Sequence, residues 1–105
     1  MEEFINMEAE KVERAFGLMT DAVEGAHKSG LVKGLRPVVN RAKAVRRLMK
    51  AGLEDGYDYT QVLPPDALGV LKEVVRVAST YAAKKIDAAD LAVVRDAIIK
   101  LGEQA

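Results

Sequence analysis

An apolar stripe near the start of the chain constrains the fold more than any other feature of the sequence. Seven apolar residues follow one another at alternating spacings of four and three positions, which places them on one side of an α-helix. They are Ile5, Ala9, Val12, Phe16, Met19, Val23 and Ala26. The pattern predicts a helix of about seven turns that buries one face. We expect it to end near Ser29 and Gly30, because glycine readily adopts the left-handed conformation that closes many helices.

Two further amphipathic segments follow the first. Residues 34–51 carry a second apolar stripe with a proline in the first turn, and this helix is expected to end near Gly52. Residues 53–64 are polar and are predicted to form a loop. A third helix is expected from Pro64 to about Lys85. It is apolar around most of its circumference, so we expect it to be central and packed against several neighbours.

The last predicted helix has the clearest start signal. Asp87 can accept hydrogen bonds from the free N–H groups of the first turn, and Asp90 has the spacing of a weak capping-box partner. Ile86 and Leu91 flank the cap at the spacing of a hydrophobic staple. The apolar stripe of this helix consists of Leu91, Val94, Ile98 and Leu101.

The predicted fold class is therefore all-α, and no segment alternates with the period of a β-strand. We expect residues 1–105 to form a single domain, a compact bundle of about four helices with the third helix central. Half of the residues are hydrophobic, which is enough for one core. The main alternative is a three-helix core from which the first helix projects to pair with another chain.

Nothing in the sequence resembles a catalytic centre, so we expect a non-enzymatic protein without cofactor, metal or small-molecule substrate. The chain has no cysteine, which removes thiol chemistry and fits a cytoplasmic protein. His27 is the only histidine and is expected at a helix end, where its charge is favourable. Glu54, Asp55 and Asp58 lack the spacing of a calcium loop. No apolar run has the length of a membrane span.

Two tyrosines lie in the predicted loop, at positions 57 and 59. A solvent-facing aromatic ring can stack on a nucleic-acid base or fill a pocket of a partner. Alternatively, one of the two rings folds back to cover the end of the bundle. The sequence leaves both possibilities open for Tyr57 and Tyr59.

The distribution of charge is the most informative functional feature. The net charge is zero, yet residues 25–53 hold eight basic side chains and no acidic one. Most of them fall on the side of the second helix opposite its apolar stripe, as a positive ridge roughly 20 Å long. Such a ridge gains most against a polyanion, because binding releases condensed counterions. The predicted nucleic-acid-binding residues are Lys33, Arg36, Arg41, Lys43, Arg46, Arg47 and Lys50.

The acidic start of the chain offers a competing interpretation. Residues 1–24 hold seven acidic and two basic side chains, so the first helix could neutralise the ridge within the fold. We expect many of these acids to face away instead, because the same helix must pack through its apolar stripe. Two functions remain open: binding of nucleic-acid backbone, or a protein–protein adaptor or oligomerising bundle whose ridge meets an acidic surface, such as the first helix of another copy.

Two segments resemble a known family. Residues 35–43, LRPVVNRAK, are similar to the basic helix of the small helical subunits of type III CRISPR effector complexes. Residues 71–85, which end in YAAKK, resemble a later helix of the same subunits. Those subunits are compact helical bundles that stack within the complex and contact nucleic-acid backbone. The resemblance implies a non-enzymatic subunit that binds RNA or single-stranded DNA within a multi-subunit complex.

Overall fold

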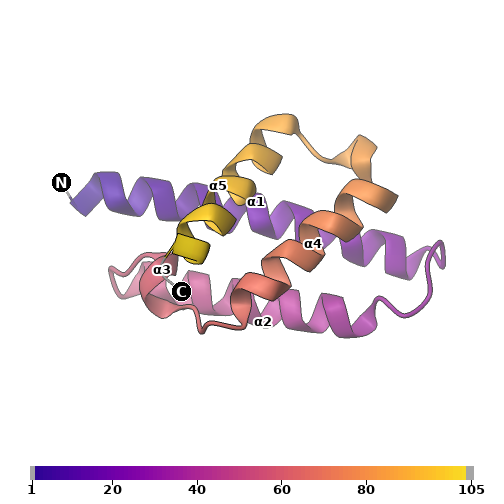
Figure 1. The fold of residues 1–105 in the computed structure, drawn as a ribbon, viewed down its shortest axis with the longest axis horizontal. Helices are drawn as coiled ribbons and strands as arrows, with labels where there is room; N and C mark the ends of the chain where they lie inside the picture. The colour runs from indigo at the N-terminus through magenta and orange to yellow at the C-terminus, as the bar shows by residue number, and fades with distance from the viewer. Residues whose placement is uncertain (1, 104–105) are drawn as a thin grey trace.

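Helices provide all the regular structure in the described part of the chain. The computed structural model describes the backbone of residues 2–103 and the side chains of residues 8–103, and no described residue belongs to a strand. The prediction of an all-α bundle is confirmed. The elements are α1 (Glu2–Lys28), α2 (Arg36–Glu54), α3 (Tyr59–Val62), α4 (Ala67–Tyr81), the 3₁₀ helix η1 (Ala83–Lys85) and α5 (Ala88–Glu103), as shown in Figure 1.

Helix α1 buries the stripe that the sequence predicts. Phe16, Met19 and Val23 are completely buried, and Ala9, Val12 and Ala26 belong to the same core. The side chain of Ile5 lies outside the described residues. The alternative of a first helix that projects from a three-helix core is therefore wrong for residues 9–26. The chain leaves the helix as expected, because Gly30 has a φ of 75°.

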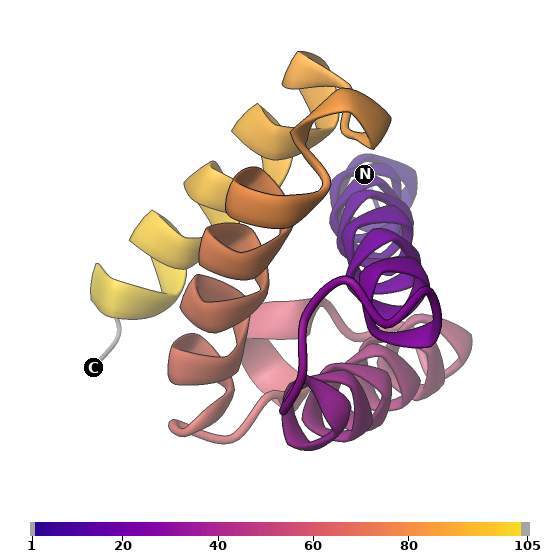
Figure 2. The same cartoon turned by 90° about the vertical axis from the view of Figure 1, so that its right-hand side faces the viewer.

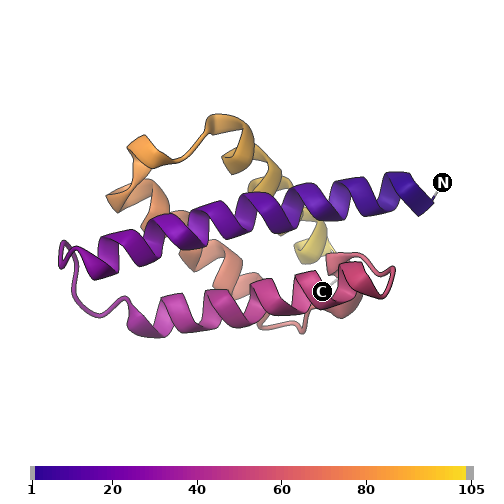
Figure 3. The same cartoon turned by 180° about the vertical axis from the view of Figure 1, so that it is seen from behind.

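Helix α2 runs antiparallel to α1 and extends one turn further than predicted (Figure 3). Pro37 lies in its first turn, as expected. Gly52 does not end the helix, because it is buried where Val62 packs against the helix backbone. The helix closes instead before Gly56, which has a φ of 82°, and the N–H of Tyr57 donates to the carbonyl of Gly52 at 2.8 Å.

The prediction of a loop over residues 53–64 is wrong for four of its residues, which form α3. Asp58 accepts a hydrogen bond from the N–H of Thr60, and Gln61 accepts one from the N–H of Asp58. This reciprocal capping box stabilises a helix start. Tyr59 is 3% exposed and Tyr57 is 51% exposed, so one tyrosine packs into the core and the other faces solvent.

Helix α4 packs against α1 and α2, and α5 packs against α1 and α4. Helix α4 contacts the three other long helices, as expected of a central helix. Helix α1 also contacts the three other long helices, so α4 is not the only central one among the described residues. It ends four residues earlier than predicted, because Ala82 leaves the helical region (φ −138°, ψ 29°) and Ile86 then packs against the core. The predicted cap of α5 is confirmed: Asp87 accepts a hydrogen bond from the N–H of Ala89 at 3.0 Å.

None of the helices in residues 2–103 combines the length and the apolar character that crossing a bilayer requires.

Two glycines within helices give opposite predictions for the same substitution. A Cβ at Gly69 would meet no atom within 4 Å, so Gly69→Ala should raise the free energy of unfolding by about 0.5–1 kcal/mol through helix propensity. A Cβ at Gly52 would stand 2.9 Å from Val62, so Gly52→Ala should lower it by about 1–3 kcal/mol through overpacking. Urea unfolding of both variants measures the two effects. A change of the same sign in both would contradict these packing environments.

Candidate nucleic-acid interface

Five of the seven predicted binding residues are exposed cations without an ion-pair partner among the described residues. Lys33 lies in the turn that joins α1 to α2, and the others lie along α2. The buried side of α2, which includes Val38, Ala42, Val45 and Met49, faces the core, as the sequence predicts. The five unpaired cations are Lys33, Arg36, Arg41, Arg47 and Lys50.

The other two predicted residues pair with acids of α1. The Nζ of Lys43 forms an ion pair with the carboxylate of Glu24. The Nε of Arg46 donates to Glu13 Oε1 at 3.4 Å, and its Nη1 lies 3.7 Å from Asp21 Oδ1. The hydrogen bond from Lys43 lowers the pKa of Glu24 below its usual value. The fold therefore neutralises one edge of the ridge and leaves the rest of the cations open.

The expectation that the acids of the first helix face away from the bundle is wrong for most of those described. Glu8 pairs with Lys100 of α5, in addition to the three acids that meet α2. An amphipathic helix has two flanks beside its apolar stripe, and acids on these flanks reach the cations of neighbouring helices. Glu10 is exposed and has no ion-pair partner among the described residues. The side chains of Glu2 and Glu3 lie outside the described residues.

Four cations surround a shallow hollow on the surface of α2. The hollow has a volume of about 290 Å³ and is lined by Lys43, Arg46, Arg47 and Lys50. No acidic residue belongs to this lining. A concave surface lined by one sign of charge concentrates the electrostatic potential and attracts the opposite ion. This part of the ridge has the chemistry of a phosphate-binding surface.

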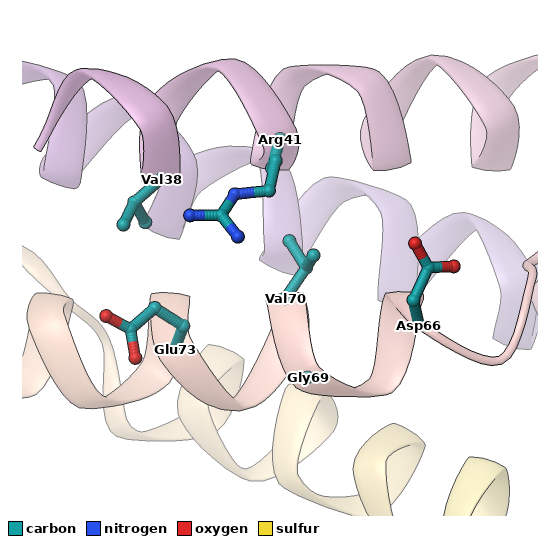
Figure 4. Close-up of a pocket in the computed structure, with 6 residues that line it drawn as sticks. All are labelled: Val38, Arg41, Asp66, Gly69, Val70 and Glu73. Carbon is teal, nitrogen blue, oxygen red and sulfur yellow. The ribbon is translucent and has the colours of Figure 1, made fainter.

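Arg41 lies apart from this hollow, in a groove between α2 and α4 (Figure 4). The figure shows its side chain reaching from α2 towards Glu73 of α4. The Nε of Arg41 donates to the carbonyl of Pro37 at 3.3 Å. The carboxylate of Glu73 is already engaged by Arg76, at 2.7 and 3.2 Å, and this hydrogen bond lowers the pKa of Glu73. Arg41 therefore belongs to a mixed-charge groove and not to the continuous positive surface.

Further cations lie at one end of the bundle, and the sequence analysis did not assign them to the site. The Nζ of Lys85 lies 3.9 Å from the position of a Cβ on Gly25, so η1 packs beside the last turns of α1. Figure 2 shows η1, the end of α1 and the loop before α2 at the end of the molecule that faces the viewer. Lys28 and Lys84 are also exposed in these elements. Only the fold brings these distant segments together, although the basic ending of residues 71–85 was a signal.

The opposite end of α2 is acidic. Glu54 and Asp55 follow the last cation of the ridge, and Asp58 caps the start of α3. The exposed Tyr57 lies between these carboxylates in the chain. Burial raises the pKa of the neighbouring Tyr59 to about 12. The positive surface ends at these acids, which would repel a phosphate chain.

The geometry defines a class of protein: an all-α bundle with one cationic helix face. Comparison of the chain with protein-family models, with curated proteins and with solved structures found no match. Among the side chains of residues 8–103, no three histidine, aspartate or glutamate groups lie close enough together to hold a metal ion.

Proposed function

We propose that this protein is a non-enzymatic helical subunit that binds the backbone of RNA or single-stranded DNA through α2. The observation that supports this most directly is the set of exposed, unpaired cations on and beside one helix face. Arg36, Arg47 and Lys50 line the same side of α2, with Lys33 just before the helix. None of these four has an ion pair to lose among the described residues, so each can exchange a counterion for a phosphate directly.

Contacts of this kind hold a strand in position without reading its sequence. The cations from Arg36 to Lys50 are separated by 14 residues of helix, or about 21 Å at 1.5 Å per residue. Residues 33–50, which carry the ridge, include no aromatic residue that could stack on a base. We therefore expect weak dependence on sequence and strong dependence on salt.

The resemblance of residues 35–43 and 71–85 to the small subunits of type III CRISPR effector complexes supports a place in a multi-subunit complex. In such a complex, protein neighbours would hold the bundle while α2 faces the nucleic acid. We expect this assembly in the cytoplasm. Both the family and the location stay predictions.

A salt titration tests the binding mode. With about four phosphates contacted, the logarithm of the association constant for a labelled oligouridylate should fall against the logarithm of the salt concentration with a slope of roughly −3. Fluorescence anisotropy at several salt concentrations measures this slope. Sodium sulfate and sodium chloride at equal ionic strength serve as a check on anion competition. A flat titration would argue against phosphate recognition.

A second candidate function is supported by the other half of the exposed face of α2. Pro37, Ala44, Leu48 and Ala51 are exposed there, and Leu48 is 42% exposed. Apolar side chains of this kind gain nothing from a phosphate chain but can pack against a protein. This strip favours an adaptor or oligomerising bundle. Light scattering with and without an oligonucleotide separates the two functions, since a salt-sensitive oligomer that ignores the oligonucleotide would favour the adaptor.

A further inference from the structure

One side of α1 presents a regular row of residues to the basic helix. Glu13, Gly17, Asp21 and Glu24 follow one another at spacings of four, four and three positions, so they share one side of α1. The three carboxylates of this row pair with Lys43 and Arg46 of α2. We call these four residues of α1 the anionic row.

Gly17 is the uncharged member of the row, and the position of Arg46 explains its small size. A Cβ on Gly17 would lie 2.5 Å from both Cζ and Nε of Arg46, and 2.7 Å from its Nη2. The guanidinium therefore occupies space beside the backbone of α1 that only glycine leaves open. Glu13 lies one turn before this position and Asp21 one turn after it, so the guanidinium lies between two carboxylates.

The same two cations also line the hollow on α2. Lys43 and Arg46 surround it together with Arg47 and Lys50, which have no ion-pair partner among the described residues. The side chains of Lys43 and Arg46 are 43% and 36% exposed, so a ligand in the hollow can reach them. Carboxylates of the row and phosphates of a strand would therefore compete for the same two cations.

We propose that the anionic row is an internal competitor of the nucleic acid, which pairs with Lys43 and Arg46 in place of phosphates and so limits affinity. This inference rests on the proposed function, because it concerns the same ridge. When a strand fills the hollow, the two cations exchange carboxylates for phosphates. The gain from these contacts is reduced by the ion pairs that are lost.

Gly17→Ala tests the proposal without any change of charge. The new methyl group would collide with the far end of the flexible Arg46 side chain, which can move away from α1, so Arg46 leaves Glu13 and Asp21 and becomes free to pair with a strand in the hollow. Affinity for an oligouridylate should rise about fivefold at about 0.1 M salt, and the slope of the salt titration should steepen by about 0.7. Gly102→Ala is the matched control, because a Cβ there meets no atom within 4 Å.

Glu24→Gln is a second, independent test, because it frees Lys43 by removing its partner. Glu10→Gln removes the same charge from α1 at a residue with no ion-pair partner among those described, and it serves as the control. Tighter binding with a steeper salt slope in Gly17→Ala and Glu24→Gln, but not in the two controls, would support the internal competitor.

Two other outcomes would reject different claims. If the wild-type protein binds and all four variants bind with the same affinity and slope, the anionic row has no influence, while the proposed function stands. An equal gain in Glu10→Gln and Glu24→Gln would likewise reject the row in favour of a general charge effect. If neither the wild-type protein nor any variant binds, the proposed function fails and the competitor fails with it.

Discussion

Reversing the charge of Arg36 and Arg47 together should lower the affinity for single-stranded RNA about a hundredfold at about 0.1 M salt. The loss of two phosphate contacts accounts for roughly 25-fold through counterion release, and repulsion by the two new carboxylates supplies the rest. Both residues are exposed and unpaired among the described residues, so Arg36→Glu/Arg47→Glu should leave the fold intact. Fluorescence anisotropy measures the binding, and circular dichroism checks the helices.

A control with the same change of net charge separates the ridge from the overall charge. Lys72 of α4 and Arg95 of α5 are exposed, lie outside the ridge and have no ion-pair partner among the described residues. Lys72→Glu/Arg95→Glu should therefore weaken binding only slightly. An equal loss in both double variants would show that net charge, and not α2, governs the interaction.

Phe16→Ala should produce the largest loss of stability of any single substitution considered. Phe16 is completely buried in the middle of α1 and belongs to the common core. Removal of a buried phenyl ring costs about 3–5 kcal/mol. For a domain of this size, each kcal/mol lowers Tm by about 4–8 °C, so thermal unfolding followed by circular dichroism should show a fall of well over 10 °C.

The neighbouring Leu18 is the matched control. It lies two positions along the same helix and is 50% exposed. Leu18→Ala should change the free energy of unfolding by less than about 0.5 kcal/mol, as is usual for surface positions. A comparable loss in both variants would mean that the two faces of α1 are not distinguished by packing.

Helical periodicity predicted the parts of the fold that depend on local pattern. The buried stripe of α1, the left-handed Gly30 and the cap at Asp87 were all readable, because each depends on residues within a few positions of one another. The end of α2 was not, since Gly52 is helical and buried, and its lack of a side chain makes room for Val62, which lies outside the helix. Helix α3 had a visible signal in the capping pair Asp58 and Gln61, which the polarity of the segment outweighed.

The candidate site was predictable in composition but not in pairing. The apolar stripe of α2 fixed which cations face outward. Which of them meet an acid depends on how far α1 and α2 are rotated about their axes, and this is set by packing in three dimensions. The sequence therefore could not distinguish Arg46, which lies between Glu13 and Asp21, from Arg47, which has no partner among the described residues.

The ion pairs between α1 and α2 have a consequence for how the two helices align. The buried side chains of α1 and α2 include many Ala and Val beside the larger Phe16, Met19 and Met49, and the ion pairs add to what this packing specifies. A slip of one turn would separate Lys43 from Glu24 and move Arg46 away from the gap at Gly17. These charges add little stability at the surface, but they are satisfied in only one register of the antiparallel pair and so favour it over its neighbours.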